Sequence, residues 1–300
     1  MPQQVNINPN QQYIPPQGPN QQYIPPQGPN QQYIPPQPYV PPEKPIVLDQ
    51  PLQELANVDC ALIDEEMDLL EVMTGCETKN KYRVTIPGQS GTKDLFLCEE
   101  SSGCCSRNCL GPGCHPFRMK IQHLLGSNLI KGVDFVNPYA VFDRHCQCTC
   151  CCFNRPQIKL YYKDKNVYGG KIMEPCSVFS PYFHIFDSDG LIKYTININC
   201  CQYGFCCRNN CCGSLVEAKF LIYEGPDFSK HHVGQIVRKV NGKNLISKAD
   251  TFSIEFPPSA TPYDKMLMIC AVLMIDYLYY SESPSQKEIE KELTENQKKS

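Results

Sequence analysis

The segment Met266–Tyr280 reads Met-Leu-Met-Ile-Cys-Ala-Val-Leu-Met-Ile-Asp-Tyr-Leu-Tyr-Tyr and is the most apolar stretch of the chain. As a helix it would be about 22 Å long, whereas the hydrocarbon core of a bilayer is about 30 Å thick. A helix that is apolar on every side and too short to span a membrane must be buried in protein. We therefore expect a buried helix, with a membrane span or re-entrant segment as the alternative. The residues expected along this central helix are Met266, Ile269, Leu273, Asp276 and Tyr280.

The chain before this helix carries short β-like segments, separated by Gly, Pro, Asn and Asp. About ten such strands can close into a barrel that holds one helix. The sequence therefore predicts a mainly β fold around a central C-terminal helix. Phe186–Leu191 is expected to form a hairpin turn, because the glutamate that closes a calcium loop is missing. The expected strands are 82–86, 93–98, 117–122, 157–163, 182–187, 192–198, 215–223, 233–240 and 251–256.

A helix is expected at the start of the ordered part, which should begin near Leu48. Val58, Leu62, Leu69 and Val72 fit one apolar face of a helix over 58–72. The acidic side chains between them would then form a solvated face.

The N-terminal segment is rich in proline and glutamine and has no charged side chain in residues 1–42. Near-copies of one ten-residue unit begin at Asn10, Asn20 and Asn30. Such a segment cannot bury enough apolar surface to offset the entropy of ordering it. We expect a disordered arm over 1–47, a barrel domain over 48–281 and a charged flexible tail over 282–300. The arm is either a spacer or, through its Pro-x-x-Pro units, a ligand for SH3 or WW domains.

Cysteine is unusually frequent, with 20 residues in 300. The chain does not open with a secretory signal, so a disulfide framework is not expected. Three clusters lie within 104–114, 146–152 and 200–212, and only Cys148 and Cys151 have the Cys-x-x-Cys spacing typical of zinc. A run of adjacent thiols suits attachment of several fatty chains, which together anchor a protein stably. The middle cluster therefore predicts acylation, ahead of zinc binding or inert thiols, at Cys146, Cys148, Cys150, Cys151 and Cys152.

Charge and motif content argue against two broad functions. The net charge is −3, so no basic excess exists to neutralise nucleic-acid phosphates. The six histidines are scattered, and none stands with a nucleophile in a recognisable catalytic motif. We expect neither a nucleic-acid-binding protein nor a classical enzyme.

Several segments resemble the phospholipid scramblase family over residues 48–281. They include Leu69–Tyr82, the Cys-Cys-x-Arg-x-Cys-x-Gly turn at Cys104–Gly111, the Cys148–Cys152 run and Ala249–Pro257, which is similar to the family's calcium-binding segment. The Met266–Tyr280 helix resembles the family's C-terminal helix. The resemblance implies a tubby-like fold, which is a closed twelve-stranded barrel around a central apolar helix. It also implies palmitate on the cysteine cluster and calcium-stimulated, ATP-independent movement of phospholipids between leaflets.

The calcium segment departs from the family pattern, because Lys248 and Ser259 replace acids at its two ends. A hard cation is held by several oxygens, with carboxylates supplying the charge. We therefore expect calcium binding to be weak if it occurs, with Asp250, Glu255 and Asp264 as candidate ligands.

Two functions are favoured, ahead of a metal-binding regulatory protein that would use the cysteine clusters. The first is phospholipid scrambling, which with one short helix would need an oligomer or a barrel that opens. The second is an acyl-anchored adaptor whose arm recruits SH3- or WW-type partners without translocating lipid. Both place the protein at the cytoplasmic face of the plasma membrane. Gly234–Gly242 resembles a nuclear-import segment of some members, but its two basic residues support a nuclear pool only weakly.

Overall fold

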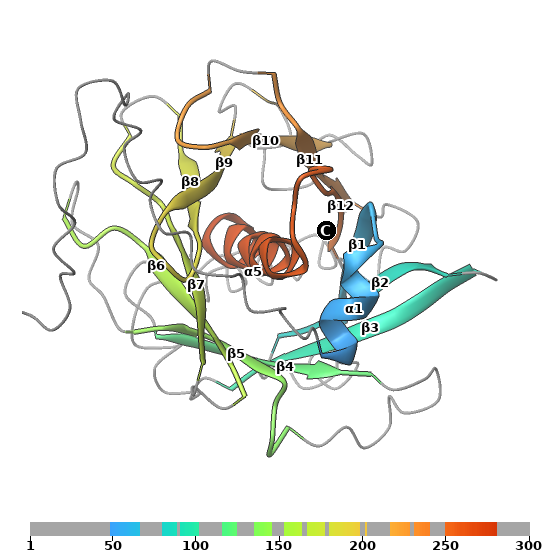
Figure 1. The fold of residues 1–300 in the computed structure, drawn as a ribbon. Helices are drawn as coiled ribbons and strands as arrows, with labels where there is room; N and C mark the ends of the chain where they lie inside the picture. The colour runs from blue at the N-terminus through green and yellow to red at the C-terminus, as the bar shows by residue number, and fades with distance from the viewer. Residues whose placement is uncertain are drawn as a thin grey trace, which may run out of the picture. The chain divides into compact units, whose positions relative to one another are not determined.

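The fold is seen in a computed structural model, whose helices and strands are drawn in Figure 1. The residues that the structure describes are 49–66, 80–88, 91–101, 116–124, 135–145, 153–163, 167–177, 180–198, 202, 217–228, 231–240 and 250–280. The expected arm and tail lie outside these residues, as do the three cysteine clusters. The elements are α1 (Gln50–Ala56), β1 (Cys60–Glu66), β2 (Lys81–Gly88), β3 (Gly91–Glu100), β4 (Phe117–His123), β5 (Ala140–Arg144), β6 (Gln157–Tyr162), β7 (Val167–Met173), β8 (Tyr182–Phe186), β9 (Ile192–Ile198), β10 (Ala218–Glu224), β11 (Gly234–Val240), β12 (Asp250–Glu255) and α5 (Pro262–Tyr279).

The twelve strands form one closed antiparallel barrel, in which each strand pairs with its neighbours in sequence. Closure comes from β1 and β12, which pair from Cys60 opposite Glu255 to Asp64 opposite Thr251. Figure 1 shows α5, in red, lying within the ring of strands. The prediction of a mainly β, closed twelve-stranded barrel around a C-terminal helix is therefore confirmed.

Alternation of side chains places the apolar half of each strand against α5. In β8, Phe183 and Ile185 are fully buried, whereas the residues on either side of them are partly exposed. Along α5, all residues from Asp264 to Tyr277 are buried, so every face of the helix contacts the barrel interior. Of the two forms expected for the Met266–Tyr280 segment, the structure therefore has the first, a helix buried inside the barrel. Among the described helices, none combines the length and hydropathy that a membrane crossing requires.

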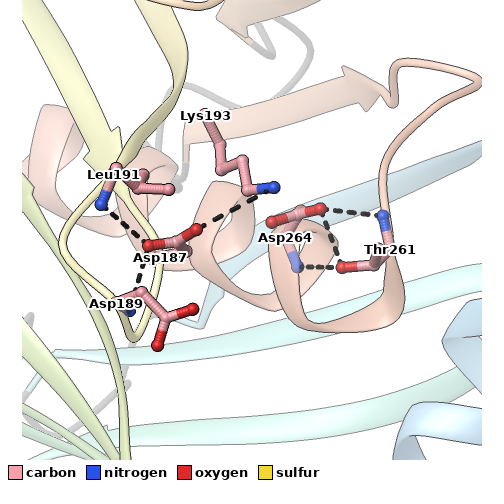
Figure 2. A network of polar contacts seen from close by, with 6 residues as sticks. All are labelled: Asp187, Asp189, Leu191, Lys193, Thr261 and Asp264. Atoms are coloured by element: carbon pink, nitrogen blue, oxygen red, sulfur yellow. Dashed lines mark hydrogen bonds and ion pairs between the residues drawn. The ribbon is translucent and has the colours of Figure 1, made fainter. Parts of the chain in front are cut away.

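The turn expected at Phe186–Leu191 joins β8 to β9, so that prediction is confirmed. The Asp187 carboxylate accepts hydrogen bonds from the backbone N–H groups of Asp189 and Leu191, at 3.0 and 2.8 Å (Figure 2). A carboxylate that satisfies its own turn in this way acts as a structural element of the hairpin.

Four expectations about local structure need correction. The helix predicted over 58–72 is wrong, because Cys60–Glu66 is strand β1, with Ala61 and Ile63 inward and acidic residues near its end. The sequence pattern missed β5, whose five residues are all buried and therefore do not alternate. It also missed β7, where Gly169 and Gly170 interrupt the apolar pattern. The short helix α1 was not expected.

Candidate functional site

The barrel has two different ends, defined by the direction of α5. Because the strands are antiparallel, even-numbered strands end at the helix-start rim, where β12 leads into α5 at Pro262. Odd-numbered strands end at the helix-end rim, the opposite end of the barrel, near Tyr279. This geometry makes α5 a plug whose two ends contact different sets of residues.

At the helix-start rim, α5 is held by a buried lysine. Lys265 is 5% exposed, and its Nζ donates hydrogen bonds to the carbonyl oxygens of Leu55, Ala56 and Val58, at 3.1, 2.9 and 2.8 Å. These carbonyls belong to the end of α1 and the turn into β1, and a helix end leaves such groups without partners. Lys265 therefore joins the central helix to the first elements of the barrel.

The first turn of α5 is closed by a capping box. The Asp264 backbone N–H donates to the Thr261 hydroxyl, and Asp264 Oδ2 accepts from the Thr261 backbone N–H at 2.9 Å (Figure 2). This reciprocal arrangement satisfies two donors that a helix start leaves free. Thr261 is thus the N-cap, and the Asp264 carboxylate has a structural role as its partner at position N3.

At the helix-end rim, the only carboxylate within α5 beyond its first turn is bonded across the barrel. Asp276 is 3% exposed, and its Oδ2 accepts a hydrogen bond of 2.6 Å from the Tyr82 hydroxyl. Tyr277 packs against Phe117, with ring centroids 4.3 Å apart. Polar and aromatic contacts therefore fix the end of the plug to β2 and β4.

A second polar group ties the end of α5 to residues next to β6 and β7. Glu174, which is 7% exposed, accepts hydrogen bonds from Arg155 Nη2 at 2.6 Å and from the Tyr279 hydroxyl at 2.8 Å. Burial raises the pKa of Glu174, although Tyr279 and Arg155 counteract that effect. The Arg238 guanidinium lies 3.8 Å from the ring centroid of Tyr280, which is partly buried just past the helix. Of the residues expected along the central helix, Met266, Ile269, Leu273 and Asp276 lie within α5, and Tyr280 directly follows it.

The helix-end rim also carries the connections that contain most of the cysteines. The six connections that begin and end at this rim hold 17 of the 20 cysteines of the sequence. The expected acylation sites, Cys146, Cys148, Cys150, Cys151 and Cys152, lie outside the described residues, between β5 and β6. Phe153, directly after them, is 75% exposed. The barrel topology thus brings the ends of separate cysteine-rich segments to one rim, which sequence order alone does not reveal.

The three candidate calcium ligands do not gather at one place. Asp250 and Glu255 are the first and last residues of β12, about 17 Å apart in an extended strand. Glu255 Oε2 accepts a hydrogen bond of 2.9 Å from Gln235, and the Asp264 carboxylate is bonded to Thr261 in the capping box of α5. Within the described ranges, no group of three His, Cys, Asp or Glu side chains is close enough to hold a metal ion. These three residues therefore do not fit a single calcium site. Residues 241–249 lie outside the part of the chain that the structure describes.

The described part of the segment that resembles a nuclear-import signal, Gly234–Val240, is strand β11. Arg238 is 6% exposed and covered by Tyr280, so one of its two basic side chains faces the interior. Sequence reasoning missed the roles of Tyr82, Lys265 and Glu174. A lysine directly before the apolar segment 266–275 was the one available signal, because an interior charge requires partners.

The family comparison covers the whole barrel and the plug. A family model described as Scramblase matches residues 40–282. The chain belongs to the phospholipid scramblase family. It is similar to phospholipid scramblase 1 of Homo sapiens, with 28% identity over 84% of this chain and 72% of that protein. It is also similar to phospholipid scramblase 2 of Bos taurus, with 29% identity over 81% and 76% of the two chains.

A more distant relative is phospholipid scramblase 4 of Homo sapiens, at 24% identity over 79% of this chain and 65% of that protein. No solved structure matches the chain. Scramblases are regarded as lipid translocators and not as classical enzymes. The family membership therefore agrees with the expectation of a lipid translocator.

Proposed function

We propose that this protein moves phospholipids in both directions between membrane leaflets without ATP. The observation that carries the proposal is the match of the scramblase family model to residues 40–282, which includes every strand of the barrel and all of α5. The named relatives carry the activity in their names, and they cover most of this chain. Calcium stimulation belongs to the same proposal as a separate, weaker part, since Lys248 and Ser259 replace family acids and Asp250, Glu255 and Asp264 do not fit a single site.

The packed interior limits how such movement takes place. Residues Met266 to Ile275 of α5 are at most 1% exposed inside the barrel, so the plug fills the space along the axis. A polar headgroup crossing about 30 Å of hydrocarbon needs a path on which it keeps polar contacts. That path therefore requires either several copies acting together or displacement of α5.

The same filled interior favours a second function, that of an acyl-anchored adaptor at the cytoplasmic face of the plasma membrane. Acyl chains on the cysteines between β5 and β6 would hold the barrel at the membrane, as two or more chains anchor stably. The Pro-rich arm would then present Pro-x-x-Pro units to SH3 or WW domains. Nucleic acid is not a partner in either proposal, and self-association belongs to the first.

A dithionite quenching assay tests the proposal. Full-length, acylated protein is reconstituted into vesicles that carry a fluorescent phospholipid in both leaflets, with calcium or with chelator. Quenching beyond the outer-leaflet half, above protein-free vesicles, supports translocation. Loss of the excess in chelator supports calcium stimulation, whereas equal excess in both conditions contradicts that part alone. No excess in either condition, from protein shown to be folded and acylated, contradicts translocation and favours the adaptor.

A further inference from the structure

The outer faces of β6, β7, β8, β9 and β10 form a surface that we call the aromatic wall. In β8, side chains alternate, so Phe183 and Ile185 face α5 while Tyr182, His184 and Phe186 face outward. The same alternation turns Tyr161 of β6 and Tyr223 of β10 outward. Aromatic side chains normally lie inside a domain, so a row of them on the outside of a barrel calls for a partner.

The rings of the aromatic wall contact one another across strands. Phe228, which is 40% exposed on the β10–β11 connection, lies 5.3 Å from Tyr182 and 5.6 Å from Tyr223, measured between ring centroids. Tyr182 is 5.1 Å from His184, which is 6.0 Å from Phe186. These contacts connect five rings into one aromatic surface, with Phe228 as its most exposed ring, while Tyr161 contacts Tyr168 of β7.

The strands of the aromatic wall carry more basic than acidic side chains, and one of the lysines, Lys193, lies 3.9 Å from the Asp187 carboxylate in the β8–β9 turn. Strands β6 to β10 contain the four lysines Lys159, Lys171, Lys193 and Lys219. Their one carboxylate is Glu224, the last residue of β10. The Lys171 Nζ lies 4.3 Å from the ring centroid of Phe186, so a cation and an aromatic ring share the same patch.

The opposite side of the barrel has a different surface. Strands β1, β2 and β3 contain six carboxylates and three basic residues. The basic Arg83 there forms ion pairs with Glu66 and Asp94, and Thr251 bonds Asp64, so polar groups satisfy each other. In the strand order, β2 is six places from β8, which is half of the barrel. One side of the barrel is therefore aromatic and richer in basic residues, and the opposite side is acidic and internally paired.

We propose that the aromatic wall lies against an anionic lipid surface, with its rings at the level of the headgroups. Tyrosine and phenylalanine flanked by lysine suit the membrane–water interface, because rings enter the apolar boundary while ammonium groups reach lipid phosphates. Each lysine near such a surface strengthens attachment. The choice of a bilayer as the occupant rests on the proposed membrane function. The orientation itself rests on the rings and charges.

The topology agrees with this orientation. The connection that holds the acylation cluster enters β6, and the connection with six further cysteines joins β9 to β10. Both therefore leave the barrel from strands of the aromatic wall or next to it. Acyl chains on either connection would hold the helix-end rim of these strands near the bilayer.

Vesicle flotation of the full-length, reduced and unacylated chain tests the inference. The vesicles contain either phosphatidylcholine alone or phosphatidylcholine with phosphatidylserine. Lys159→Glu with Lys171→Glu should weaken binding to the anionic vesicles by about tenfold or more. The matched control is Lys81→Glu with Lys239→Glu, which makes the same charge change outside the wall and should alter binding less than about twofold. Equal weakening by both pairs, or none by the first, overturns the proposal.

A second matched pair tests the aromatic part. Phe228 is 40% exposed on the wall, and Leu62 is 38% exposed on β1. Phe228→Ser should weaken vesicle binding by about threefold to tenfold, whereas Leu62→Ser should leave it unchanged. Equal effects of the two substitutions overturn the aromatic assignment. If a single-stranded oligonucleotide binds through the same residues and vesicles do not, the lipid assignment is wrong.

Failure of this inference is distinct from failure of the proposed function. Wall-dependent binding without scrambling leaves the docking surface intact and contradicts translocation. The opposite result is also informative. If the wall substitutions change neither membrane binding nor scrambling, measured at equal amounts of bound protein, the docking surface alone is contradicted.

Discussion

The Tyr82 hydroxyl donates a hydrogen bond of 2.6 Å to Asp276 Oδ2, joining residues that are 194 positions apart in sequence. Burial, and next the Asp276 carboxylate, raise the pKa of Tyr82 well above its ordinary value. The hydroxyl therefore keeps its proton and remains a donor at neutral pH. Tyr82 is the element by which the barrel wall accommodates an acidic residue in an otherwise apolar helix.

Tyr82→Phe should lower the free energy of unfolding by about 1.5–3 kcal/mol, because a buried carboxylate loses a donor. Chemical denaturation measures this loss. Tyr194→Phe is the matched control, since its hydroxyl is 3.2 Å from Ser259 in a less buried place, and it should cost less than about 1 kcal/mol. A smaller loss for Tyr82→Phe than for the control contradicts the assigned role.

Lys265→Met should destabilise the chain by about 2–4 kcal/mol, because three backbone carbonyls lose their donor while the side-chain volume is kept. Lys193→Met serves as the control, since that side chain is 50% exposed, and should change stability by less than about 0.5 kcal/mol. Both are measured as urea midpoints. Indistinguishable midpoints would mean that Lys265 does not join α5 to α1.

Gly170→Ala should cost about 3 kcal/mol or more. A Cβ there would lie 2.4 Å from the Phe186 carbonyl oxygen and 2.9 Å from Leu267 Cδ1, and φ is +135°. Gly190 also has a positive φ, but a Cβ there meets nothing within 4 Å. Gly190→Ala should therefore cost only about 1–2 kcal/mol. Thermal unfolding of both variants compares steric overlap with backbone strain, and equal losses would contradict the close approach of β7 to α5.

Thiol reactivity should separate buried from exposed cysteines. Cys98 and Cys270 are buried, and burial raises the pKa of Cys98 to about 12, whereas Cys60 and Cys176 are exposed. Because the thiolate is the reactive form, maleimide should label Cys60 and Cys176 in the folded chain and the other two only in denaturant. Peptide mass mapping gives the order in which these four cysteines are labelled. Labelling of Cys98 as fast as Cys176 would contradict the packed interior.

Acid should destabilise the chain partly through His184. Burial lowers the pKa of this imidazole below its ordinary 6.5, and Nδ1 lies 3.0 Å from the Thr195 hydroxyl. Below about pH 6.5 the unfolded chain therefore takes up the proton before the folded chain does, so stability falls as pH decreases. His184→Gln should flatten the change in unfolding midpoint between pH 7 and 5. The exposed His232→Gln should not, and a flattening by both would contradict the assignment.

Several parts of this protein follow from local sequence. Residues 266–275 contain no polar side chain, so burial on every face was predictable without knowing the partner strands. The Asp187 turn was also predictable, because an aspartate followed by Gly190 closes a hairpin through local hydrogen bonds. Strands such as β8 and β9 were found because one of their faces is buried and the other is not.

Tertiary structure decided what local patterns left ambiguous or concealed. Val58–Val72 satisfies helical spacing, yet Ala61 and Ile63 point inward in a strand because β2 and β12 pair with it. The partners of Asp276 and Lys265 lie about 200 positions away, and closure of the barrel alone brings them within hydrogen-bond distance. The same closure turns one row of aromatic residues outward. Which face of a strand is inside depends on the complete sheet, and no single strand contains that information.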